Sequence, residues 1–146
     1  MRFDGQWLEC DDGIVRPVIR ADVLAADHEW RAVEFLVDTG ADRTVMSANI
    51  LESLNLETSC PRDRIGGVGG LVDSIAVATQ IRLTRDDGEK VVFRGHYAAC
   101  TNQEALDMSV LGRDLLEMFA VIVDRRANVV AVIGGQHQYT IQRQSM

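Results

Sequence analysis

The residue best placed to do chemistry is Asp38, which follows the apolar segment 35–37 and precedes Thr39 and Gly40. Glycine permits a tight turn, so the backbone N–H groups of that turn and the Thr39 hydroxyl should lie near the carboxylate. A carboxylate held in this way can act as a general base or a general acid. Taken alone, the tripeptide is equally consistent with a turn that merely ends a strand.

A second notable segment is the glycine-rich stretch 64–70, with the sequence RIGGVGG. It has three interpretations: a flexible surface turn, a phosphate-binding loop, or the tip of a hairpin that closes over a ligand. A phosphate-binding loop needs a following Lys-Ser/Thr and a helix, and neither is found here. Glycines in a hairpin tip would let it bend over a peptide and exclude water, and the neighbouring motifs favour this interpretation.

A second apolar segment runs into glycine at 110–112, and a short helical pattern follows it. The region around Asp38 has the same order of strand, glycine and short helix. This echo is too brief for a solenoid repeat. It predicts a β domain with an approximate internal twofold axis.

The elements that must position these motifs are mostly strands. Alternation of apolar and polar residues predicts a long hairpin over 74–99, with an Asp-Gly turn at 87–88. Further strands are predicted over 14–24, 31–37, 119–123 and 129–133. Two short helices are predicted, one capped by Ser47 with Ile50, Leu51 and Leu54 on one face, and one over 113–118 with Leu115, Leu116 and Met118 facing inward. The fold class is therefore mainly β.

Length and charge narrow the functions further. The chain has 146 residues, which predicts one domain over residues 1–146. Its net charge of −7 argues against nucleic acid or an anionic membrane as a partner. No apolar run reaches the roughly 20 residues of a membrane span, and no secretory signal is visible at the N-terminus.

The cysteines and histidines carry no metal or disulfide signature. Three cysteines, Cys10, Cys60 and Cys100, are odd in number and widely separated, without a C-x-x-C pair. Neither a disulfide framework nor a zinc site is expected, and no other cofactor is implied. Reduced thiols fit a cytoplasmic protein.

In order and spacing, the three motifs resemble those of the retropepsin-like aspartic proteases, the single-domain relatives of pepsin and of retroviral proteases. Asp38-Thr39-Gly40-Ala41 is similar to the catalytic motif, 64–70 to the flap tip, and 110–116 to the family's apolar-apolar-Gly motif with its following helix. The resemblance covers residues 14–133. It implies half of a pepsin-like molecule, a closed β-barrel with two short helices and a flap hairpin.

The resemblance also implies a mechanism. Aspartic proteases use two carboxylates that share one proton, because like charges that close cannot both ionise. The chain has no second Asp-Thr/Ser-Gly motif, so the expected enzyme is a homodimeric endopeptidase with Asp38 contributed by each chain. Asp114 is the rival within one chain, at a position where the family carries Asn or Asp structurally. The catalytic set is then Asp38, Thr39 and Gly40.

Other residues take roles by the same resemblance. Asp42 is expected to bind the substrate backbone and to pair with Arg113. The alternative is that this ion pair only stabilises the fold. A peptide or protein substrate would be contacted by Ala41, Asp42, Ile65, Gly66, Gly67, Val68 and Gly69, while Leu111, Gly112 and Arg113 give structural support. Ile65, Val68 and Leu71 predict apolar subsites.

Two departures from related proteases affect the expected pH optimum and the expected dimer interface. Pepsins usually carry Ser where Ala41 stands, and a hydroxyl bonded to a carboxylate favours its charged form. Without that donor, we expect a mildly acidic to near-neutral pH optimum. The N-terminal extension 1–13 departs from the minimal pattern, and the tail 136–146 is either a dimer-interface strand or a frayed polar terminus.

A second function stays open at this stage. The same fold can serve as a catalytically silent module for peptide binding or dimerisation, because a motif does not prove turnover.

Overall fold

The computed structural model describes the backbone of residues 1–67, 70–137 and 142, and the side chains of the same residues except 58–73. Val68, Gly69 and most of the predicted tail 136–146 lie outside the described residues. The order of elements is β1 (Arg2–Asp4), β2 (Gln6–Glu9), β3 (Val15–Leu24), β4 (Trp30–Val37), β5 (Val45–Met46), α1 (Ala48–Leu54), β6 (Thr58–Gly67), β7 (Gly70–Thr84), β8 (Lys90–Cys100), β9 (Val110–Leu111), α2 (Arg113–Leu116), β10 (Phe119–Asp124) and β11 (Val129–Gly134).

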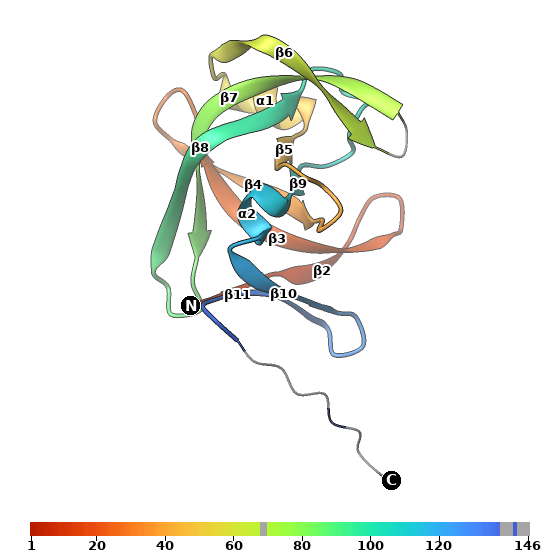
Figure 1. Cartoon of the computed structure of the whole chain (residues 1–146), viewed down its shortest axis with the longest axis vertical. Coiled ribbons are helices and arrows are strands. Elements are labelled where there is room, and N and C mark those ends of the chain that lie inside the picture. The colour runs from red at the N-terminus through yellow and green to blue at the C-terminus, as the bar shows by residue number, and fades with distance from the viewer. Residues whose placement is uncertain (68–69, 138–141, 143–146) are drawn as a thin grey trace.

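The large sheet closes on itself. Its strands follow the order β2-β3-β4-β9-β5-β8-β7-β6, and β3 also pairs with β7. The closing contact is antiparallel, with Asp22 opposite Arg82 and Val23 opposite Ile81. The ring β3-β4-β9-β5-β8-β7 is therefore a small barrel, as predicted, and β6 continues beyond it as one arm of a hairpin (Figure 1).

A second sheet of three strands, in the order β1-β11-β10, lies at the other end of the molecule from the β6–β7 hairpin (Figure 1). Arg2–Asp4 pair with Ala131–Ile133, and the Phe3 side chain is 1% exposed. The Phe3 ring meets Phe119 edge to face, with ring centroids 5.7 Å apart. The predicted extension 1–13 thus supplies a strand to each sheet, because β2 pairs with β3.

The predicted hairpin over 74–99 is present as β7 and β8. Ser74 lies opposite Cys100 at one end of the pairing, and Thr84 lies opposite Lys90 at the other. Alternate side chains of β7 face the core, among them Ile75, Val77, Ile81 and Leu83. Gly88 has a φ of 89° in the connecting turn, a conformation that favours glycine. The predicted strands over 14–24, 31–37, 119–123 and 129–133 are likewise present, with bounds within one residue.

Both predicted helices are present, with differences at their ends. Ser47 is the N-cap of α1, but its side chain forms no capping hydrogen bond. The helix ends at Asn55, whose left-handed φ of 50° suits asparagine. The prediction that Met118 faces inward is wrong: α2 stops at Leu116, the chain turns toward β10, and Met118 is 51% exposed.

The core lies inside the barrel and continues to the second sheet. Its largest fully buried side chains include Phe35, Met46, Leu54 and Leu111. None of the helices in the described part of the chain is long and apolar enough to cross a membrane.

Candidate active site

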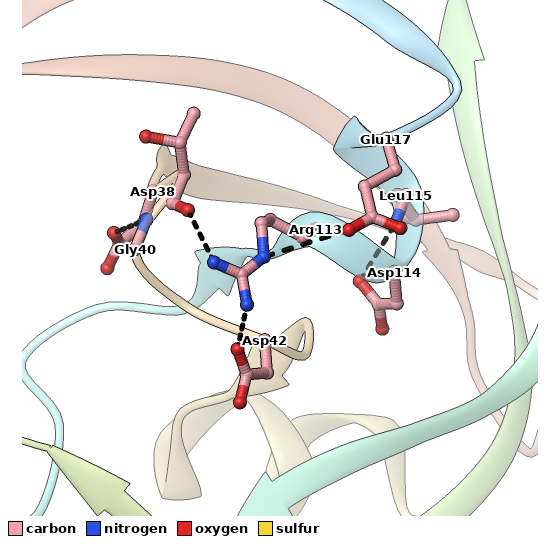
Figure 2. Close-up of polar contacts among 8 residues, drawn as sticks. Asp38, Gly40, Asp42, Arg113, Asp114, Leu115 and Glu117 are labelled. Atoms are coloured by element: carbon pink, nitrogen blue, oxygen red, sulfur yellow. Dashed lines mark hydrogen bonds and ion pairs between the residues drawn. The ribbon is translucent and has the colours of Figure 1, made fainter.

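Asp38 lies immediately after β4, at the start of a turn that its own carboxylate stabilises. The Gly40 N–H donates to Asp38 Oδ1 at 3.0 Å, and the Ala41 N–H donates to the Asp38 carbonyl at 3.2 Å. Asp38 is half-buried, while Thr39 and Gly40 are exposed. The predicted catalytic triplet therefore sits at the surface with its acid partly shielded. Figure 2 shows Asp38 and Gly40 in this turn.

Parallel pairing of β4 with β9 brings the first and third motifs together. Leu36 and Val37 lie opposite Val110 and Leu111. The Asp38 N–H donates to the Leu111 carbonyl at 3.1 Å.

Beyond the strands, the two loops stay in contact. The Arg113 N–H donates to the Ala41 carbonyl at 2.8 Å, and the Asp114 N–H to the Asp42 carbonyl at 3.2 Å. The backbone thus places the predicted support residues beneath the predicted catalytic loop.

Arg113 lies between the Asp38 turn and Asp42 (Figure 2). Its Nη2 forms the predicted ion pair with Asp42 Oδ1, its Nη1 donates to the Thr39 carbonyl at 3.4 Å, and its Nε is 3.8 Å from Glu117 Oε1. The Asp42 side chain is 81% exposed, so solvent screens the pair and its contribution to stability is at most about 1 kcal/mol. The pair orients the loop and leaves the Asp42 carboxylate accessible to a ligand.

Gly112 permits the close approach of the two loops. A Cβ at this position would lie 2.3 Å from both the carbonyl carbon and the oxygen of Arg43, and 2.8 Å from the Thr44 nitrogen. These are backbone atoms and cannot swing aside. A side chain at residue 112 would therefore push the Asp38 loop away from α2.

Asp114, the rival acid, is already engaged by the loop. Its Oδ1 accepts from the Thr44 hydroxyl at 2.7 Å and from the Leu115 N–H at 2.9 Å, and its Oδ2 accepts from the Thr44 N–H at 2.9 Å. The sequence analysis did not single out Thr44, because a lone threonine before a short strand carries no distinguishing signal.

The glycine-rich segment forms the end of an antiparallel hairpin. Ile65 lies opposite Val72, Gly66 opposite Leu71, and Gly67 opposite Gly70. In Figure 1, the free end of this hairpin projects on the same side of the molecule as the loop after β4. Val68 and Gly69, the predicted tip, lie outside the described residues.

A shielded tyrosine lies near the support residues. Tyr97 is 5% exposed, and its hydroxyl donates to the Phe93 carbonyl at 2.8 Å. Burial raises the pKa of Tyr97 to about 12, and the negative charge of Asp114 adds to that rise. Within the described residues, no group of three or more His, Cys, Asp or Glu side chains is arranged to hold a metal ion.

The geometry agrees with comparisons to known proteins. Residues 27–118, well over half of the chain, match the family described as "gag-polyprotein putative aspartyl protease". The chain belongs to the retropepsin-like aspartic protease family. No curated protein sequence matches this retropepsin-like chain.

Two solved structures show the same fold. EIAV protease complexed with the inhibitor HBY-793 is 24% identical, with a TM-score of 0.50 over 70% of this chain and 86% of that protease. A retropepsin-like aspartic protease from Rickettsia conorii is 17% identical, with a TM-score of 0.51 over 90% of this chain and 98% of that protein. The retropepsin-like fold expected from the sequence is therefore confirmed.

Proposed function

We propose that this retropepsin-like protein is an aspartic endopeptidase, and that it acts as a homodimer in which Asp38 of each chain forms a catalytic pair. One observation carries the proposal: the half-buried Asp38 stands in an exposed Asp-Thr-Gly turn held from below by β9 and α2. In the pair, one carboxylate takes a proton from the attacking water and the other gives a proton to the scissile carbonyl oxygen.

The need for a second chain follows from the other acids near the turn. Asp42 is paired with Arg113, and both oxygens of Asp114 accept hydrogen bonds from Thr44. Because both carboxylates are engaged by other groups, we assign neither of them as the partner of Asp38. The Thr39 hydroxyl is exposed and has no hydrogen-bond partner within the described residues, so it is available to the same turn of a second chain.

The substrate is an extended peptide that lies between the Asp38 pair and the β6–β7 hairpin, which acts as a flap. An extended peptide adds backbone hydrogen bonds in the manner of a strand. The backbone of Gly40 and the exposed carboxylate of Asp42 bind it from one side, and residues 65–69 cover it from the other. Glycines in that hairpin let it close and exclude water.

We place the enzyme in the cytoplasm. Cys10 and Cys100 are both free thiols in the structure, which suits a reducing compartment. The proposed partners are a second copy of this chain and the peptide substrate.

The test is cleavage of a mixed peptide library, read by mass spectrometry between pH 4 and 8. Wild type is compared with Asp38→Asn and with the matched control Asp124→Asn. Asp124 is an exposed acid in the β10–β11 turn, where its carboxylate accepts from the Ala127 N–H. New peptide termini are expected with wild type and Asp124→Asn, and not with Asp38→Asn. Specific activity should rise with enzyme concentration, because only the dimer is active.

Each alternative has its own outcome. Peptide binding by wild type and Asp38→Asn alike, without cleavage by either, identifies a silent binding module. Cleavage by both proteins means that another group performs the chemistry, and the assignment of Asp38 is then wrong.

A further inference from the structure

The three-stranded sheet has an open edge along β10, and its hydrogen-bond register shows which groups lie there. The Gly5 N–H donates to the Val130 carbonyl at 2.7 Å, so Val130 and every second residue of β11 direct their backbone groups toward β1. Backbone groups along an antiparallel strand point alternately to its two neighbours. The intervening residues of β11 therefore bond to β10, where they lie opposite Ala120, Ile122 and Asp124.

The remaining residues of β10 form its free edge. The N–H and C=O groups of Phe119, Val121 and Val123 point away from β11. In the part of the chain that the structure describes, β10 pairs with no strand except β11. Such a row of unpaired backbone groups is a template for a further strand. A strand from another molecule can therefore extend the sheet at this edge.

The other strands at sheet edges each have a feature that discourages pairing. The edge of β1 is short, and its Arg2 carbonyl accepts from the Asp86 N–H of the β7–β8 turn at 3.0 Å. The strand β6 contains Pro61 and a shift of register between Ser59 and Asp63, and β2 has only four residues. In contrast, β10 has six residues in unbroken register, without lysine or proline. The fold therefore protects its other edges and leaves β10 unprotected.

The composition of β10 suits pairing with a second copy of itself. Its first five residues, FAVIV, carry no charge, and Val123 and the preceding Met118 are half-exposed apolar side chains. The net charge of −7 opposes self-association unless the contact is uncharged or complementary. In an antiparallel pair, the start of one β10 lies beside the end of the other. Glu117, just before the strand, then approaches Arg125 and Arg126, just after it.

One register uses all the outward groups of β10. With Val121 opposite its own copy, Phe119 of each chain lies opposite Val123 of the other, and these are the three residues whose N–H and C=O groups are free. A strand paired antiparallel with its own copy is an isologous contact and generates a twofold axis.

The same symmetry is required by a catalytic pair of Asp38 carboxylates. The strand β10 is also close in the chain to the catalytic turn, because only Glu117 and Met118 separate it from α2. The first residue of α2, Arg113, donates to the Thr39 carbonyl. An interface on β10 therefore connects through α2 to the Asp38 turn of each chain.

We propose that a second copy of this chain binds along the β10 edge, so that the two three-stranded sheets join into one continuous sheet. The need for a second copy rests on the proposed function. The interface lies on an internal strand and does not need the tail 136–146. Because β1 stays paired with β11 of its own chain, each chain folds before it associates, and the dimer dissociates without losing a strand.

The test measures the dissociation constant of the dimer by sedimentation over a series of protein concentrations. Val121→Pro removes an outward N–H and leaves the hydrogen bonds to β11 intact, so it should raise the Kd of the dimer at least about tenfold. Val123→Lys adds to the edge the residue that natural edges use against pairing, and it should act in the same direction.

Two variants are matched controls. Asp4→Pro makes the proline change on the β1 edge, and Val92→Lys makes the lysine change at an exposed valine of β8. Both should keep the Kd of the dimer within about twofold of wild type. Truncation after His137 should keep it as well, because the tail lies outside the proposed interface. Circular dichroism checks that each variant is folded, and Val123→Lys decides the question if Val121→Pro does not fold.

The outcomes separate this interface from the proposed function. A wild-type dimer that the β10 variants dissociate, but that cleaves no peptide, contradicts the proposed function and leaves the interface standing. An active wild type whose dimer survives Val123→Lys and a folded Val121→Pro contradicts the interface alone. Loss of the dimer on truncation after His137, with the β10 variants still dimeric, assigns the contact to the tail and overturns the proposal. A wild type that stays monomeric up to its solubility limit overturns both.

Discussion

Substitution of Gly112 by alanine should damage both stability and activity. The new Cβ would lie 2.3 Å from the Arg43 carbonyl carbon and oxygen, so the loop must move about 1 Å to reach ordinary van der Waals distance. Overpacking of this kind costs about 1–3 kcal/mol. The same movement stretches the bonds from Gly112 N–H to Thr44 and from Thr44 N–H to Asp114, each worth about 1 kcal/mol.

The expected total for Gly112→Ala is about 3–5 kcal/mol of unfolding free energy, or a melting temperature lower by about 10–15 °C. Thermal and urea denaturation measure it, with kcat measured in parallel on the folded fraction. Gly134→Ala is the matched control. Its Cβ would lie 2.9 Å from the Met1 Cε, the end of a flexible and half-exposed side chain that can move away.

We expect Gly134→Ala to cost less than about 1 kcal/mol. If the two variants unfold at the same denaturant concentration, the close approach of Gly112 to the Asp38 loop does not limit the stability of the fold. If Gly112→Ala loses stability but keeps its full kcat, the path of the loop is not coupled to the chemistry.

Two other predictions concern parts of the fold outside the loop. Phe3→Ala should cost about 3–5 kcal/mol of unfolding free energy, because Phe3 is 1% exposed and packs on Phe119. Urea denaturation measures this loss, and a loss below about 1 kcal/mol would show that β1 adds nothing to the core. Tyr97 holds its proton more tightly in the folded protein, because burial raises its pKa from 10.0 to about 12. Its contribution to the free energy of unfolding is therefore complete below pH 10 and is lost as the pH rises through 12. Wild type should lose about 2 kcal/mol more than Tyr97→Phe between pH 10 and 12, and parallel pH profiles of the two would contradict the assignment.

Local sequence patterns were sufficient for most strands and for the motif positions. The alternation around Ile75–Leu83 is a short-range signal, and the structure places those side chains in the core. The pairing of Arg113 with Asp42 was expected from the resemblance and is present. What the patterns do not encode is the partner of a short strand: Phe3 lies opposite Val132, and nothing near Phe3 in sequence indicates this.

The errors at helix ends have a local cause. The periodicity that suggested an inward Met118 assumes that the helix continues, whereas α2 stops at Leu116 and the chain turns into β10. Thr44 escaped notice because its importance depends on Asp114, 70 residues away, and on the lack of space around Gly112. Such a role belongs to the folded arrangement and has no signature in a short segment.

The pairing of β1 with β11 has a consequence for synthesis of the protein. Arg2–Asp4 leave the ribosome first among the strands, yet their partners Ala131–Ile133 are made more than a hundred residues later. The second sheet therefore forms only after translation has passed residue 133, and contacts so distant in sequence make folding slow. A nascent chain that already contains Asp38 still lacks this sheet, so the complete fold around the candidate active site forms only after residue 133 has been made.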